Sequence, residues 1–79
     1  MTRMFSEREE MRMLISDFAG RAYYNKKRAK GYASQMILAD NPVDASYWKV
    51  QYRIALATAD ALKSVVKDIV EVYRHLYIA

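Results

Sequence analysis

Two long stretches of the chain repeat apolar residues at alternating spacings of four and three. The first series is Met11, Ile15, Phe18, Ala22, Asn25, Ala29, Tyr32, Met36 and Ala39, with Asn25 as its polar member. The second series is Trp48, Tyr52, Ala55, Ala59, Leu62, Val66, Ile69, Tyr73 and Leu76. This spacing is typical of a helix that packs one face against another helix. The pattern predicts two long helices, over about residues 6–40 and 42–77.

Signals for helix ends agree with this division. Ser6 followed by Glu9 forms a capping box, which marks the start of the first helix. Asn41 is a favourable N-cap for the second helix, and Pro42 suits its first position. A connection as short as residues 40–44 makes the two helices antiparallel neighbours.

The chain is therefore expected to be a single all-helical domain over residues 1–79, folded as a long antiparallel hairpin, with residues 1–5 as a flexible N-terminus. Gly20 and Gly31 lie inside the first predicted helix, and each weakens a helix by about 1 kcal/mol relative to alanine. A three-helix bundle with a break near Gly20 or Gly31 is the alternative. The hairpin is preferred because the apolar series keeps its phase across both glycines.

A chain of 79 residues without cysteine needs another source of stability, and self-association is the simplest one. Apolar residues flank the second series beyond what one partner helix can cover. These residues are Val50, Ile54, Leu56, Val65, Val70 and Val72. Surplus apolar surface of this extent indicates a partner, so we expect a homodimer that forms a four-helix bundle. A hairpin that turns at Asn41 also places Asn25 opposite Thr58, and these two side chains are expected to hydrogen-bond across the helices.

Catalytic, metal and cofactor sites are not expected. The absence of cysteine excludes thiolate zinc sites, and His75 is the single histidine. Glu7, Glu9 and Glu10 suit the positive end of the first helix dipole and have no histidine nearby to complete a metal cluster. No apolar run approaches the roughly 18 residues of a membrane span. The chain is interpreted as a cytoplasmic protein that is not an enzyme and has no membrane partner.

Positive charge is concentrated in one stretch. The net charge is +4, and five bases with no acid lie between Asp17 and Asp40. Bases and tyrosines on a helix can contact phosphates and stack on nucleotides. The candidate nucleic-acid-binding residues are Arg21, Tyr23, Tyr24, Lys26, Lys27, Arg28 and Lys30. The competing interpretation is a solvated helix face.

Seven tyrosines and one tryptophan also suit a protein-binding surface. The candidate interface residues are Tyr24, Ile37, Leu38, Tyr47, Val50, Ile54, Val70 and Tyr77. The preferred hypothesis is a small self-associating helical protein that binds another protein, as a regulator, inhibitor or assembly factor; its size alone suggests a phage or mobile-element origin. The alternative is a dimeric nucleic-acid-binding protein that uses residues 21–30.

Overall fold

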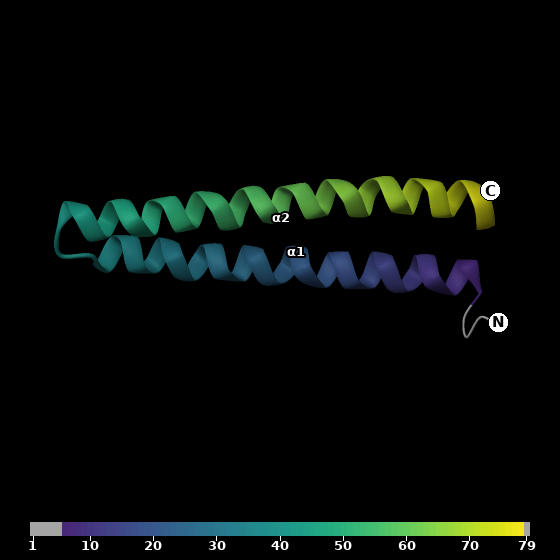
Figure 1. Ribbon diagram of the computed structural model, residues 1–79, viewed down its shortest axis with the longest axis horizontal. Coiled ribbons are helices and arrows are strands. Elements are labelled where there is room, and N and C mark those ends of the chain that lie inside the picture. Colours follow the sequence, from purple (N-terminus) through teal and green to yellow (C-terminus); the bar gives the residue numbers. More distant parts are fainter. Residues whose placement is uncertain (1–5, 79) are drawn as a thin grey trace, which may run out of the picture.

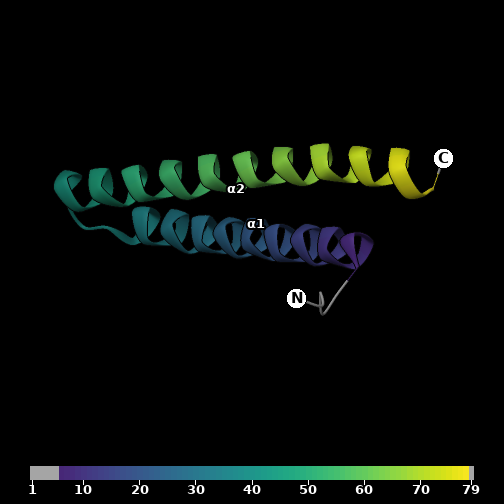
Figure 2. The ribbon, with the colours of Figure 1, turned by 45° about the vertical axis from the view of Figure 1, so that its right-hand side comes forward.

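The computed structural model describes residues 6–78, which form two antiparallel helices (Figure 1). Helix α1 runs from Glu7 to Leu38 and helix α2 from Pro42 to Tyr77, and residues 39–41 connect them. The helices lie side by side along their length in both views (Figures 1 and 2), in a molecule that measures 57 × 28 × 14 Å. The predicted all-helical hairpin is confirmed.

The alternative three-helix bundle is wrong, because α1 continues without a break through Gly20 and Gly31. Neither glycine has positive φ, so neither is needed for an unusual backbone conformation. The prediction that residues 1–5 are flexible concerns residues outside the described part of the chain.

Side chains close both helix starts as the sequence predicts. The Ser6 hydroxyl accepts a hydrogen bond from the Glu9 backbone N–H at 3.2 Å. The Asn41 side-chain oxygen accepts from the Asp44 N–H at 2.9 Å, and its amide nitrogen donates to the Asp44 carboxylate, also at 2.9 Å. These bonds satisfy N–H groups that a helix start leaves without partners. Pro42 occupies the first turn of α2, where its missing N–H costs nothing.

The two predicted apolar series form the seam between the helices. Every member of the first series is at least half-buried, and Ala29 is 2% exposed. The members of the second series are also at least half-buried as far as Tyr73. Leu76 is 58% exposed, and the next residue, Tyr77, is half-buried instead. Within residues 6–78 the buried side chains of the core are Ala29, Ala55, Ala59 and Tyr73. One hairpin therefore encloses a very small core.

Aromatic side chains close the two ends of this seam. Near the turn, Tyr32 stacks on Trp48 with ring centroids 5.8 Å apart, and Tyr47 meets Trp48 edge-on at 4.9 Å. At the open end, the rings of Tyr73 and Tyr77 lie 5.2 Å apart. Alanines occupy the middle, where small side chains let two helices approach closely.

The predicted hydrogen bond between Asn25 and Thr58 is wrong. The Asn25 amide donates to the backbone carbonyl of Arg21 at 2.9 Å, and the Thr58 hydroxyl donates to that of Ile54 at 2.8 Å. Each side chain thus bonds to the backbone carbonyl one turn back on its own helix. Every helix offers this acceptor to such a side chain. Both residues line one groove between the helices.

Candidate interaction surfaces

The buried seam divides the surface of the hairpin into two broad sides, and a groove between the helices runs along each. One groove is lined by Ala19, Tyr23, Lys26, Ala59, Asp60 and Lys63, among others. The opposite groove is lined by Gly20, Arg21, Tyr24, Asn25, Thr58 and Leu62, among others. These linings fix which residues of each helix border which side. The remaining surface residues follow by counting around each helix from the seam.

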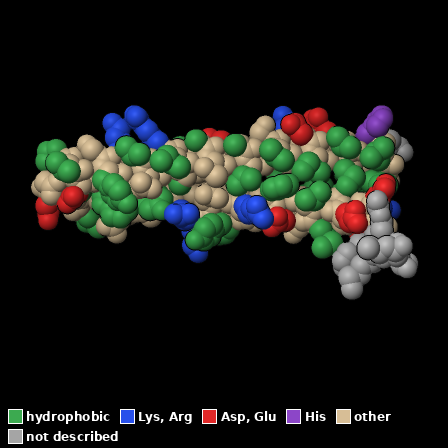
Figure 3. Space-filling model, in the orientation of Figure 1, with side chains coloured by type: hydrophobic (Ala, Val, Ile, Leu, Met, Phe, Trp, Pro, Cys, Tyr) green, Lys and Arg blue, Asp and Glu red, His purple; other side chains and the backbone are tan. Residues whose placement is uncertain are grey.

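The side with the Arg21 and Tyr24 groove is here named the apolar face. Its exposed large apolar residues come from both helices, and they are Leu14, Tyr24, Leu38, Tyr47, Ile54, Val65 and Val72. Their exposed fractions range from 41% for Val65 to 72% for Leu38. Figure 3 shows the hairpin from this side, with hydrophobic side chains along both helices. Exposed apolar surface of this length is typical of a binding surface.

Both arginines of the apolar face are held by neighbouring side chains. Arg21 forms an ion pair with Asp17 at 3.1 Å. Arg28 donates to the Tyr32 hydroxyl at 2.6 Å, and its guanidinium lies 5.7 Å from the centroid of the Tyr24 ring. The hydrogen bond to Tyr32 stabilises the charged guanidinium and raises the pKa of Arg28 above its ordinary value. These two cations already have protein partners.

The opposite side is here named the basic face. Its eight bases are Arg12, Lys26, Lys30, Lys49, Arg53, Lys63, Lys67 and Arg74, and all are exposed. Within the helices, Glu9 and Asp60 are the acids on this side. The apolar face instead sets five acids (Glu7, Glu10, Asp17, Asp44 and Asp68) against its two arginines. Positive charge is therefore concentrated on one side of the hairpin.

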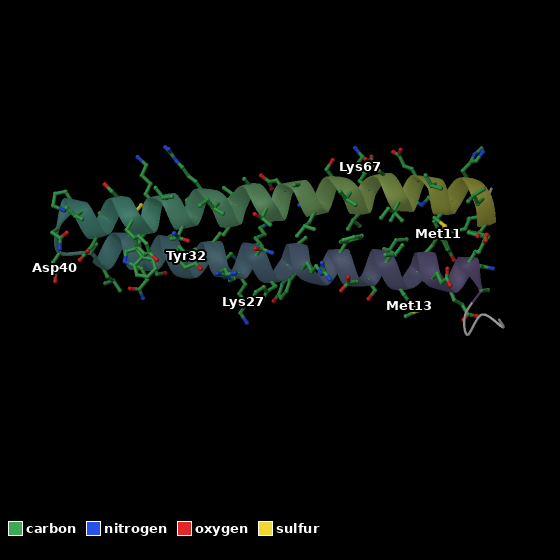
Figure 4. All side chains as sticks on the ribbon, in the orientation of Figure 1. Met11, Met13, Lys27, Tyr32, Asp40 and Lys67 are labelled. Carbon is green, nitrogen blue, oxygen red and sulfur yellow. The ribbon has the colours of Figure 1, made fainter. Side chains whose placement is uncertain are left out.

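The predicted nucleic-acid stretch does not form one patch. Tyr23, Lys26 and Lys30 belong to the basic face, whereas Arg21, Tyr24 and Arg28 belong to the apolar face. Lys27 lies on the outer surface of α1 and points away from α2 (Figure 4). Consecutive residues on a helix point in different directions, so a charge run in sequence is distributed around the helix.

The predicted protein-interface residues divide in a similar way. Tyr24, Leu38, Tyr47 and Ile54 share the apolar face, and Val50 is exposed on the outer surface of α2. Ile37, Val70 and Tyr77 lie toward the basic face, where Val70 and Tyr77 are half-buried.

The candidate interface residues did not include Leu14, Val65 and Val72 of the apolar face, although Val65 and Val72 are among the surplus apolar residues that predict a partner. A sequence signal for them exists, because each directly precedes a member of the apolar series: Ile15, Val66 and Tyr73. In both helices this position borders the same side of the seam.

Cations and aromatic rings meet at the open end of the hairpin. The Arg8 guanidinium donates to the Tyr73 hydroxyl at 3.0 Å and lies 5.8 Å and 5.7 Å from the ring centroids of Tyr73 and Tyr77. Arg12 lies 6.0 Å from the Tyr73 ring. The hydrogen bond from Arg8 lowers the pKa of Tyr73 and raises that of Arg8.

Across residues 6–78, no three His, Asp or Glu side chains gather where they could hold a metal ion. His75 is exposed in the last turn of α2. Neither described helix is long and apolar enough to cross a membrane.

Fold and surfaces together define an antiparallel helical hairpin with two chemically distinct broad faces. No family model, curated protein or solved structure matches the chain.

Proposed function

We propose that the protein is a non-enzymatic interaction protein whose hairpins pair through their apolar faces into a four-helix bundle, and that the bundle binds another protein as a regulator, inhibitor or assembly factor. The observation that carries this proposal is the exposure of seven large apolar side chains on one side of a hairpin whose described core has four buried residues. Burying such side chains from water is the main driving force of association.

The dimensions of the apolar face support this pairing. Each partner in a stable interface buries roughly 800 Å², and the apolar face extends along a hairpin that is 57 Å long. A second copy offers a surface of the same length and composition, and a two-fold axis lets the same patch serve both partners. In this arrangement the basic face of each hairpin remains on the outside of the bundle.

The turn supplies a surface for the protein partner. Ile37, Leu38 and Val43 are the most exposed large apolar residues in residues 6–78, at 80%, 72% and 78%. They surround the tip of the hairpin, and Tyr47 lies one turn further along α2. Because Ile37 and Val43 lie outside the apolar face at one end of a long bundle, an apolar groove of another protein can receive them without disturbing the dimer.

Light scattering coupled to size-exclusion chromatography tests self-association. At tens of micromolar we expect a mass twice the 9.2 kDa of one chain. The double variant Ile54→Glu with Val65→Glu places two carboxylates on the apolar face and is expected to give the mass of one chain. Val50→Glu, at a similarly exposed valine outside that face, is the matched control and should remain a dimer. A wild-type mass of one chain would refute the pairing.

The contribution of the tip is tested separately. The double variant Ile37→Ser with Val43→Ser, at two tip residues outside the apolar face, should keep the dimer mass and lose any protein that co-purifies with the wild type. Retention of that protein by the tip variant would show that partners bind elsewhere.

A further inference from the structure

We propose that the basic face binds the phosphate backbone of a double-stranded nucleic acid without reading its sequence. This surface differs from the basic stretch at residues 21–30, because five of its eight bases (Lys49, Arg53, Lys63, Lys67 and Arg74) come from α2. It also stands apart from the proposed pairing of apolar faces, since one hairpin carries the whole basic face.

The alignment of the helices arranges these bases in a row. Contacts between Tyr32 and Trp48 near the turn, and between Arg8 and Tyr73 at the open end, fix this alignment. Lys30 and Lys26 of α1 consequently lie level with the first half of α2, and Arg12 lies near its end. From Lys49 to Arg74 the row spans about 38 Å at the helical rise of 1.5 Å per residue. That length is close to the roughly 34 Å of one turn of duplex DNA.

The cations of this row are available to an outside partner. None of the eight forms an ion pair within residues 6–78, and Arg12 is in contact with the ring of Tyr73. Asp60 is the one helical acid inside the row. Phosphate binding gains its free energy by releasing counterions from the nucleic acid, which requires protein cations that are not already neutralised. The basic face meets this requirement, whereas on the opposite face Arg21 is paired with Asp17 and five acids outnumber the two arginines.

The shape of the face favours backbone contacts over base contacts. The major groove of duplex DNA is about 12 Å wide and admits a single helix. Two helices packed side by side are roughly 20 Å wide, so the face cannot enter the groove. It can lie across the phosphates that border the groove, and such contacts carry no sequence information.

An anionic membrane fits this face less well. A helix on a membrane surface inserts apolar side chains that lie between its bases and the lipid. On the basic face the strongly exposed apolar side chains are Tyr23 and Ile37, and most others lie on the apolar face or on the outer surfaces of the helices. Lys67 projects from the outer edge of α2, away from α1 (Figure 4), so it lies at the border of the basic face.

The test is fluorescence anisotropy of a labelled duplex of about two helical turns, titrated with the full chain over a salt series. Two double variants are compared: Lys63→Gln with Lys67→Gln on the basic face, and Arg21→Gln with Arg28→Gln on the apolar face. Each removes two positive charges from the net +4, so an effect of net charge alone would weaken both equally. All four residues are exposed, and circular dichroism will verify that both variants keep the helical content of the wild type.

We expect the Lys63/Lys67 variant to bind roughly tenfold more weakly than the wild type, and its plot of log affinity against log salt to lose about two units of slope. The Arg21/Arg28 variant should stay within about twofold of the wild type. Equal weakening of both variants, greater loss in the Arg21/Arg28 variant, or no binding by the wild type at low salt would each overturn the proposal. Binding to phosphatidylserine vesicles without binding to the duplex would assign the face to membranes instead.

The same titration with Ile54→Glu and Val65→Glu separates this proposal from the pairing of apolar faces. A single-chain mass with retained, salt-sensitive duplex binding supports the basic face as a unit of one hairpin. Loss of binding in that variant, with helical content preserved, would contradict it.

Discussion

The exposed cations of the basic face, from both helices, form no ion pair within residues 6–78. On the apolar face, Arg21 forms an ion pair with Asp17 and Arg28 donates a hydrogen bond to Tyr32. The apolar face in turn exposes seven large apolar side chains, and the basic face exposes few. Both faces border the same seam, so the contrast arises from the residues that flank it. Leu14, Val65 and Val72 each directly precede a seam residue, and this position borders the apolar face in both helices. The comparison teaches that one narrow core can support two surfaces of unrelated chemistry.

A charge buried in the seam should unfold the hairpin and so disrupt both faces. Ala59 is 5% exposed and lies against α1 beside Ala19 and Ala22. Ala59→Asp would bury a carboxylate without a partner, at a cost of about 3 kcal/mol or more, a large part of the stability of so small a domain. We expect loss of cooperative unfolding in far-ultraviolet circular dichroism. Ala57→Asp, at an exposed alanine of the same helix, is the control and should unfold like the wild type.

Stiffening α1 should strengthen the scaffold of both faces. An added Cβ at Gly20 or Gly31 would meet nothing within 4 Å outside the local helix. Gly20→Ala and Gly31→Ala are therefore each expected to stabilise the fold by about 1 kcal/mol through helix propensity alone. For a domain of this size that is a rise in melting temperature of roughly 4–8 °C. A lower melting temperature for Gly31→Ala would indicate that something outside one hairpin, such as a second copy, approaches this residue.

Replacing the polar member of the seam should stabilise the hairpin without changing its assembly. Asn25 is half-buried and its amide bonds only to its own helix, at the Arg21 carbonyl. Asn25→Leu adds apolar burial beside Leu62 and is expected to stabilise the hairpin by about 0.5–1 kcal/mol in urea denaturation. The mass by light scattering should not change. A different mass would show that Asn25 determines the alignment or assembly of the helices.

The helices and the seam could be predicted from the sequence because their signals are local. Ser6, Asn41 and Pro42 specify helix starts within a few residues, and spacings of four and three specify a buried stripe on each helix. The exchange of Leu76 for Tyr77 at the open end was not predicted. An α-helix turns slightly away from a strict seven-residue repeat, by about 20° per repeat, so the buried position moves to the next residue by the last turn of α2.

The candidate surfaces were less predictable, because they depend on how two helices face each other. The stretch at residues 21–30 is continuous in sequence but surrounds α1, so Lys26 and Arg28 point to opposite sides. The basic face joins Lys26 to Lys63, two residues far apart in sequence that border one groove. The Asn25 amide was expected to bond to Thr58 on α2, but it donates to the Arg21 carbonyl one turn back on its own helix. Pairing between distant residues is information that periodicity along one helix does not contain.

The smallest expected effect is a pH dependence at the open end, where Tyr73 of the seam meets Arg8 and Arg12. The hydrogen bond from Arg8 lowers the pKa of the Tyr73 hydroxyl below the ordinary value of 10.0, and the charge of Arg12 adds to this effect. Between the lowered pKa and 10.0 the folded chain binds fewer protons than the unfolded chain, so stability rises with pH. This contribution is complete above the ordinary pKa and is lost as pH falls through the folded pKa. The free-energy difference between the wild type and Tyr73→Phe in urea denaturation should therefore grow in favour of the wild type from about pH 8 to about pH 10.5. Arg8→Gln should flatten that growth, since Arg8 is its main cause. A difference that stays constant with pH, in chains that both keep Arg8, would mean that the contact between Arg8 and Tyr73 does not persist in solution.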